Sequence, residues 1–249
     1  MVTAADGAEG FYQGQNNEAR YESSQEARDL DKRLINAWVG HPHFSIIDNK
    51  VQNFKKKVDK CVETVCRYIG LPTPTSFYKK FLLRARGQFQ VNAPKNVKME
   101  FFQIEEIFLV TQGDMVENFV KKTGKNDSFT YNHEMRSYQS GERIERKRQI
   151  SAREYIEMIE QQRHPKRKIL QKVRQCFIFE QQYFLVETYL NIDGKPSFLR
   201  IETSKEHKEI KIPEFLMVVK EVTHDDVYSS QNMADVDYKM PANDKKAIS

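Results

Sequence analysis

The sequence predicts an α+β protein in two parts. A partial α/β unit is expected over residues 1–71, and a mainly antiparallel β domain with flanking helices over residues 77–230. In the first part apolar residues recur at helical spacing, whereas in the second they alternate with polar residues as in a β-strand. Between the two patterns, Pro72 and Pro74 break any helix and stiffen the chain. Residues 72–76 are therefore predicted to be a linker.

The composition fits a globular protein with a small hydrophobic core. The chain has 249 residues, of which 39% are hydrophobic and 30% charged, and its mean hydropathy is −0.72. No run approaches the roughly 20 apolar residues that cross a bilayer, and the N-terminus lacks the basic and apolar regions of a signal peptide. Three cysteines cannot form a closed disulfide framework. These features predict a cytoplasmic protein in a reducing compartment.

The first expected element is a helix that begins after Ser23. The spacing of Ser23 and Glu26 is that of a capping box, in which the side chains satisfy the first backbone N–H groups. Gly40 stands where such a helix ends. The short apolar run 44–47 follows and is predicted to be a strand.

A second helix is expected to start at Asp48 or Asn49, either of which can cap it, and to end at Gly70. A single strand between two helices cannot bury both of its own faces. Residues 1–71 therefore resemble the end of an α/β domain whose front is missing.

The second part contains one predicted helix, which the Ser151 and Glu154 capping box opens. Asp193 and Gly194 form a strong hairpin-turn signal. Residues 231–249 are polar and are predicted to be a flexible tail. The expected strands or strand pairs are 77–86, 98–110, 116–122, 128–136, 142–150, 167–179, 183–191, 197–203 and 209–222.

Positive charge is concentrated in the middle of the chain. Residues 78–174 carry 21 Lys and Arg against 12 Asp and Glu. In most expected strands the charged residues share one face and the apolar residues the other. Two interpretations remain open: an ordinary sheet with its charged face in water, or a sheet curled into a tunnel that binds a polyanion.

The order of motifs favours the second interpretation, because it resembles a known family. The first part is similar to the back half of the P-loop NTPase (AAA-type) domain of the TRPL-translocation-defect family, which is related to the kinase half of the NadR proteins. The segments that carry this resemblance are Val2–Tyr12, Asn17–Arg20, Trp38–His43 and Ile47–Asn49, with Phe54 and Lys57.

The second part resembles the CYTH-like domain of the same family, which is akin to the triphosphate tunnel metalloenzymes. The resemblance implies an antiparallel β-barrel or tunnel, a GTP- or ATP-binding partner domain and a role in intracellular trafficking. The segments that carry it are Lys79–Leu83, Tyr131, Arg143–Arg148, Ser151–Tyr155, Lys172–Arg174, Tyr183–Glu187, Leu199–Glu202, Ile212–Leu216 and Glu221–Tyr228.

Two departures from the family pattern argue against catalysis. No G-x-x-x-x-G-K-[ST] phosphate loop occurs, so the chain is expected to be a fragment, with GTP or ATP bound only in a full-length form. In the tunnel enzymes an E-x-E-x-K strand binds divalent metal. Aligning Lys80 with that lysine places Ser76 and Tyr78 at the glutamate positions. No catalytic residue is therefore predicted, and Mg²⁺ or Mn²⁺ is the only cofactor considered.

The candidate site follows from the basic positions that the resemblance preserves. The predicted phosphate-binding residues are Lys80, Arg84, Lys121, Arg136, Lys172, Arg174 and Arg200. Carboxylates expected to orient them or to hold metal are Glu105, Glu145, Glu187 and Glu202. Asp48 and Asn49 are interpreted as the remnant of the nucleotide domain.

The main functional hypothesis is a binding module for a phosphorylated small molecule, such as a nucleotide or polyphosphate, or for a phosphoinositide headgroup. The alternatives are a metal-dependent tri- or polyphosphate hydrolase that uses the four carboxylates, and a scaffold. The basic run 163–168 suggests peripheral contact with an anionic membrane, or a solvated loop. Nucleic-acid binding is not expected, because no RNA-recognition signature occurs.

Overall fold

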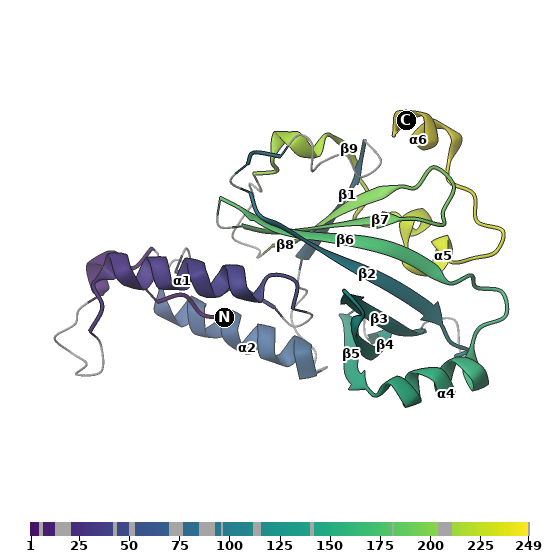
Figure 1. The fold of residues 1–249 in the computed structure, drawn as a ribbon, viewed down its shortest axis with the longest axis horizontal. Coiled ribbons are helices and arrows are strands. Elements are labelled where there is room, and N and C mark those ends of the chain that lie inside the picture. The colour runs from purple at the N-terminus through teal and green to yellow at the C-terminus, as the bar shows by residue number, and fades with distance from the viewer. Residues whose placement is uncertain are drawn as a thin grey trace.

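A nine-stranded sheet dominates the computed structural model (Figure 1). The strands are β1 (Phe77–Leu83), β2 (Met99–Phe108), β3 (Val116–Lys125), β4 (Ser128–Gln139), β5 (Glu142–Ile150), β6 (Leu170–Phe179), β7 (Gln182–Tyr189), β8 (Ser197–Thr203) and β9 (Val218–Glu221). Their order is β5-β4-β3-β2-β6-β7-β8-β1-β9, and every neighbouring pair is antiparallel. The predicted α+β class with a large antiparallel sheet is confirmed. The structure describes residues 1–4, 7–12, 21–41, 44–49, 53–69, 77–84, 93–95, 97–111, 116–139, 142–180, 182–203 and 211–248.

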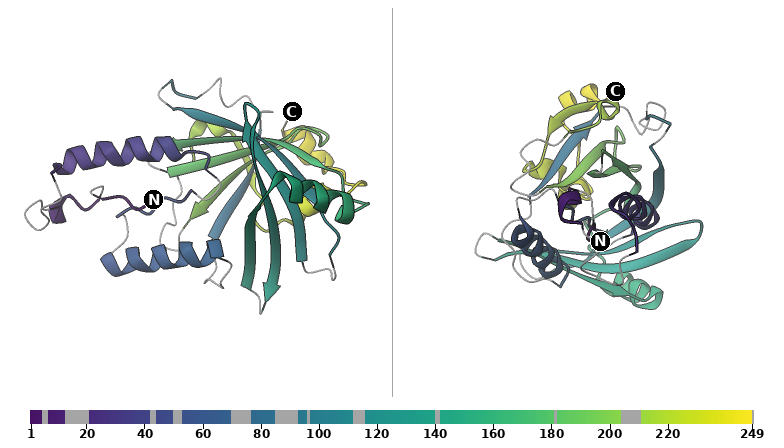
Figure 2. Two further views of the ribbon diagram at one scale, coloured as in Figure 1. Left: turned by 60° about the horizontal axis from the view of Figure 1, so that its bottom comes forward. Right: turned by 90° about the vertical axis from the view of Figure 1, so that its left-hand side faces the viewer.

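The sheet is strongly curved, which gives it an inner and an outer face (Figure 2). On the outer face, helix α4 (Ala152–Gln162) covers one apolar cluster and the short helix η3 (Glu214–Leu216) covers another. The Ser151–Glu154 capping box that starts α4 is present as predicted. Since each strand alternates its side chains between faces, the charged residues of the candidate site are left to the inner face.

The inner face has an apolar end that the C-terminal segment closes. Helices η4 (Asp226–Tyr228), α5 (Ser230–Met233) and α6 (Ala242–Ala247) pack there, and Met233 and Ile248 are almost fully buried. The prediction of a flexible tail is therefore wrong for the described part of 231–249. The isolated apolar residues of this polar segment are the ones that enter the core.

The N-terminal part consists of η1 (Glu9–Phe11), α1 (Ser24–Trp38) and α2 (Phe54–Ile69), with a parallel bridge between Val2 and Ile47. The helices lie on either side of the N-terminal segment (Figure 2). The capping box of α1 is confirmed. The cap predicted for α2 is wrong, because Asn53 Oδ1 accepts the backbone N–H of Lys56 at 3.0 Å.

Both N-terminal helices expose the apolar stripes from which they were predicted. The side chains inside the unit include the small or polar Ala27, Asp31, Lys57 and Thr64. The exposed apolar side chains are Leu30, Leu34, Trp38, Phe54, Val58, Val62, Val65 and Ile69. That these residues belong to a P-loop domain stays a prediction.

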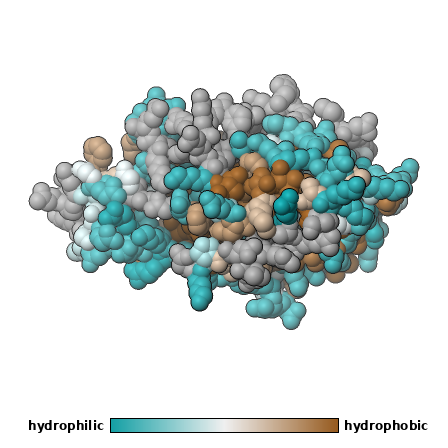
Figure 3. Space-filling model, turned by 90° about the horizontal axis from the view of Figure 1, so that it is seen from above, coloured by the Kyte–Doolittle hydropathy of each residue, from teal (hydrophilic) through white to brown (hydrophobic). Residues whose placement is uncertain are grey.

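Seen from above, the surface of the molecule shows a hydrophobic area bordered by hydrophilic atoms (Figure 3).

Several boundaries differ from the sequence-based expectations. The strand expected over 209–222 is reduced to β9, because Pro213 leads into η3. The linker 72–76 lies outside the described residues. Among the helices that the structure describes, none combines the length and apolarity needed to cross a bilayer.

Candidate functional site

Basic and acidic side chains from eight strands, β1 to β8, meet on the inner face of the sheet, where they form a layer of charges. We call this set the charged layer. Two-residue alternation places its members on one face of each strand. Its described basic members are Lys80, Lys121, Arg136, Lys147, Lys172, Arg174 and Arg200, and its acidic members are Glu106, Glu117, Glu134, Glu145 and Glu187.

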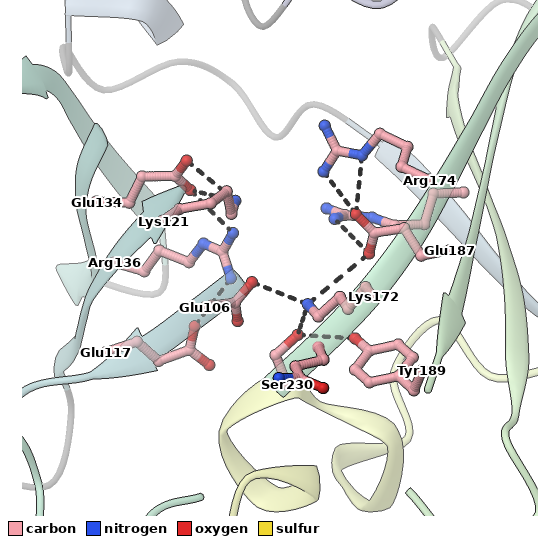
Figure 4. Close-up of polar contacts among 12 residues, drawn as sticks. Glu106, Glu117, Lys121, Glu134, Arg136, Lys172, Arg174, Glu187, Tyr189 and Ser230 are labelled. Carbon is pink, nitrogen blue, oxygen red and sulfur yellow. Dashed lines mark hydrogen bonds and ion pairs between the residues drawn. The ribbon is translucent and has the colours of Figure 1, made fainter. Parts of the chain in front are cut away.

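One half of the charged layer comes from β3, β4 and β5 and is centred on Glu134 and Arg136 (Figure 4). Lys121 Nζ donates to both carboxylate oxygens of Glu134, each at 3.0 Å. Arg136 forms ion pairs with Glu117 at 3.0 Å and with Glu145 at 3.1 Å. Since Arg136 contacts carboxylates of all three strands, it ties this half of the sheet together.

The other half comes from β2, β6, β7 and β8 and is centred on Glu187. Arg174 donates to Glu187 Oε1 through Nη2 at 2.5 Å and through Nε at 3.0 Å. Lys172 and Arg200 approach Glu187 Oε2 at 4.0 and 3.8 Å. Lys172 Nζ also donates to Glu106 Oε2 at 2.8 Å, and both of these side chains are about 2% exposed.

Aromatic rings of the apolar end form a floor beneath the cations. Lys172 Nζ lies 4.6 Å from the ring centroid of Tyr189, and Lys80 Nζ lies 4.3 Å from that of Phe198. The Arg136 guanidinium lies 4.7 Å from the ring centroid of Phe119. Ring faces attract cations, and more strongly where water is excluded. The rings therefore hold these basic groups in place from one side. The opposite side of each group faces the interior of the curved sheet.

The carboxylates of the charged layer stay ionised although they are buried. Burial alone raises the pKa of Glu134, but Lys121, Lys147 and Arg136 outweigh it and hold that pKa well below its usual value. In the same way Arg174, Lys172 and Arg200 hold the pKa of Glu187 well below its usual value against the effect of burial. Glu134 and Glu187 are therefore fixed negative charges at neutral pH.

The low pKa of Glu134 predicts how stability responds to acid. The stabilisation is complete above the unfolded pKa of about 4.3 and is lost as the pH falls toward the lower folded pKa. Glu134→Gln should remove up to about 1.4 kcal/mol per pH unit from the slope of unfolding free energy below about pH 4. Denaturant titrations of both proteins at several pH values measure this slope. Glu157→Gln, in an exposed pair with Arg153, is the matched control and should leave the slope almost unchanged.

Six of the seven predicted phosphate-binding residues lie in or beside the charged layer. Arg84 does not. It follows the end of β1, is exposed, and donates from Nε to the Ala247 carbonyl at 3.3 Å. Because β1 ends at Leu83, the alternation that places Lys80 on the inner face does not extend to Arg84.

The predicted carboxylates divide in a similar way. Glu145 and Glu187 belong to the charged layer. Glu105 lies on the outer face, where it accepts a hydrogen bond from Tyr155 of α4 at 2.8 Å. Its neighbour Glu106 is the residue that faces inward. Glu202 lies in β8, but its side chain is outside the described part of the structure.

The remaining predicted positions lie elsewhere. Asn49 accepts a hydrogen bond from Lys57 and donates to the Ala4 carbonyl, so it anchors the N-terminal segment to α2. Asp48 lies beside it in the N-terminal part. In the basic run 163–168, Arg167 pairs with Asp235 at 3.0 Å and is thereby tied to the C-terminal segment.

Glu106, Glu134 and Lys147 were not among the site residues predicted from the sequence. Glu134 and Lys147 are in register on β4 and β5. Alternation with Tyr131 and Met135 was the available signal for Glu134, whereas Lys147 stands between two arginines and has no such signal. For Glu106 the signal was ambiguous, because Glu105 and Glu106 are consecutive and period two assigns one to each face. Ile107, which faces the outer apolar cluster, resolves the choice.

The described carboxylates do not fit a divalent cation. Hard cations such as Mg²⁺ need several charged oxygen ligands, whereas the inner carboxylates are engaged by Lys or Arg. Among the residues that the structure describes, no group of three or more His, Cys, Asp or Glu is arranged around a metal position. Ser76 and the side chain of Tyr78, which the sequence analysis placed at metal-binding positions, lie outside the described part.

No protein-family model matches the chain, and no curated protein matches it in sequence. Solved structures do show partial likeness. The inorganic triphosphatase NE1496 is 19% identical, with a TM-score of 0.45, over 68% of this chain and 99% of its own. HpAC1 from Hippeastrum, described as having a dominant triphosphatase activity, is 11% identical, with a TM-score of 0.40, over 53% and 80%. The PH1819 protein from Pyrococcus horikoshii OT3 is 10% identical, with a TM-score of 0.40, over 52% and 80%.

These scores and identities are too low to decide function. The resemblance to the TRPL-translocation-defect family stays a prediction, because none of the comparisons bears on it. What the chain does must therefore be inferred from its own side chains.

Proposed function

We propose that the chain binds a compact oligophosphate anion, represented by linear triphosphate, in its charged layer. The observation that carries this proposal is the convergence of Lys172, Arg174 and Arg200 with cations of β3, β4 and β5 over one aromatic floor. Figure 4 shows Lys172 and Arg174 on one side of the layer and Lys121 and Arg136 on the other. The described layer contains seven basic and five acidic side chains. Its excess of positive charge favours a polyanion.

The donor groups of the site favour phosphate oxygens. Arginine offers paired N–H donors that match phosphate oxygens, and lysine adds compact charge. Arg200 is the suitable probe, because its side chain is 33% exposed and its contact with Glu187, at 3.8 Å, is longer than that of Arg174, at 2.5 Å. It lies at the accessible side of the layer, where it can contact a ligand.

Arg200→Ala should weaken tripolyphosphate binding about 10- to 100-fold, the value of one charge-assisted hydrogen bond of about 1.5–3 kcal/mol. Calorimetric titration at two salt concentrations measures the affinity and its screening. Arg153→Ala on the outer surface is the control and should bind like the unchanged protein. Equal affinity of the Arg200→Ala variant and the control would exclude binding at the charged layer.

A second candidate, hydrolysis of the same ligand, is supported by Glu106. Its Oε1 is buried and has no hydrogen-bond partner among the described residues, so it can accept a proton from an attacking water. The water oxygen would bond to the terminal phosphorus, which becomes orthophosphate, while its bridging P–O bond breaks and pyrophosphate, or GDP in the case of GTP, leaves. The proton taken up by Glu106 would pass to the oxygen of that leaving group. Release of phosphate from tripolyphosphate or GTP, with and without Mg²⁺ or Mn²⁺, tests this candidate.

Two finer proposals come from the sequence resemblance. The anion would be a phosphoinositide headgroup at a membrane, and a GTP- or ATP-binding domain would regulate its binding in trafficking. Vesicles of phosphatidylcholine with and without a phosphoinositide separate a lipid ligand from a free oligophosphate. Binding to both vesicle types alike would overturn the headgroup proposal.

A further inference from the structure

Lys80 differs from the other basic residues of the charged layer in its partners. In the register of β1 and β8 it lies directly across from Arg200, and like charges in such positions repel. Its Nζ donates to the main-chain carbonyl of Tyr228 and lies over the Phe198 ring. The ion pairs that the structure describes in the layer join other cations to the carboxylates.

Charged groups from four other strands act on Lys80. Arg200 on β8 and Lys172 on β6 are positive, while Glu187 on β7 and Glu106 on β2 are negative. Both carboxylates already form ion pairs with other cations. In the pair of Glu187 with Arg174, the charged atoms are 2.5 Å apart. Lys80 is therefore a surplus cation in a buried position, held by a neutral carbonyl and a ring.

We propose that Lys80 couples ligand binding to proton uptake: a fraction of the free protein carries it as an amine, and it becomes an ammonium when an oligophosphate occupies the charged layer. This inference rests on the proposed function. The proton comes from the buffer, and the negative charge of the ligand compensates the repulsion from Arg200 and Lys172.

The pKa of Lys80 supports this geometry. Burial, followed by repulsion from Arg200 and Lys172, lowers the pKa to about 7. An anion in contact with the ammonium raises that pKa again. Binding should then take up about 0.9 proton at pH 8 but only about 0.1 at pH 6, and affinity should fall as the pH rises above 7.

Calorimetric titration of tripolyphosphate in buffers of different ionisation heat counts the protons taken up. The unchanged protein and Lys80→Met are compared at pH 6 and pH 8, so that protonation of the ligand itself cancels in the difference. Lys147, whose pKa burial lowers to about 8, also takes up protons, and Lys147→Met provides the matched comparison. At pH 8, Lys80→Met should take up about one proton fewer than the unchanged protein.

The outcomes separate the two proposals. Equal proton counts for the unchanged protein and Lys80→Met at pH 8, with clear binding heat in both, would overturn the coupling and leave the binding function intact. No binding heat at either pH would overturn the proposed function itself. Lys80→Arg keeps the charge at both pH values and should bind without the additional proton, which checks that a loss in Lys80→Met is not caused by misfolding.

Discussion

Lys172→Met is expected to lower the free energy of unfolding by about 3–5 kcal/mol, the usual result of removing one partner from a buried ion pair. Lys172 and Glu106 are each about 2% exposed, and their charged atoms are 2.8 Å apart. Without the ammonium, Glu106 keeps a buried charge with no direct hydrogen-bond donor, since its other oxygen already has no partner among the described residues. Chemical denaturation at neutral pH measures the change.

The double variant Lys172→Met with Glu106→Gln separates charge from packing. It should recover most of the stability lost by the single variant, because it leaves no unpaired charge. Arg153→Met removes one partner of an exposed pair in α4 and should cost less than about 1 kcal/mol. If the double variant were as unstable as the single one, the ion pair would not be the cause of the loss.

Sequence periodicity was sufficient to identify the strands and the face on which most charges lie. Lys172 and Arg174 were predicted to share a face, and the structure places both on the inner one. The alternation could not show whether the sheet curls. That depends on how distant strands meet, and the pairing of β2 with β6, across β3, β4, β5 and α4, is not encoded in any local pattern.

The errors at Arg84, Glu105 and the C-terminal tail have a common physical cause. In each case the position of a side chain depends on a partner far away in the sequence. Ala247 accepts the hydrogen bond of Arg84, and Tyr155 of α4 holds Glu105 on the outer face. Tail residues such as Met233 are ordered because they complete an apolar core that other strands supply. From its polar composition alone, the same segment was predicted to be flexible.

Glu187→Gln should have the opposite effects on stability and on ligand binding. Glu187 approaches Arg174, Lys172 and Arg200 at 2.5–4.0 Å and so acts as an internal anion for three cations. Neutralising it removes the carboxylate charge that these three cations share, which should cost the free protein about 3 kcal/mol or more. The same cations are then available to phosphate oxygens, and we expect tripolyphosphate to bind about tenfold more tightly, a gain of about 1.4 kcal/mol.

Thermal unfolding with increasing tripolyphosphate reports both effects together. The Glu187→Gln variant should unfold at a lower temperature without ligand, and its transition should rise more steeply with ligand concentration, because ligand that binds only the folded state stabilises it by mass action. Glu157→Gln serves as the surface control. Weaker binding by Glu187→Gln would contradict the model of an internal anion. It would mean that the carboxylate itself helps to hold the ligand, through a bridging cation or a ligand hydroxyl group, and the hydrolase alternative would gain support.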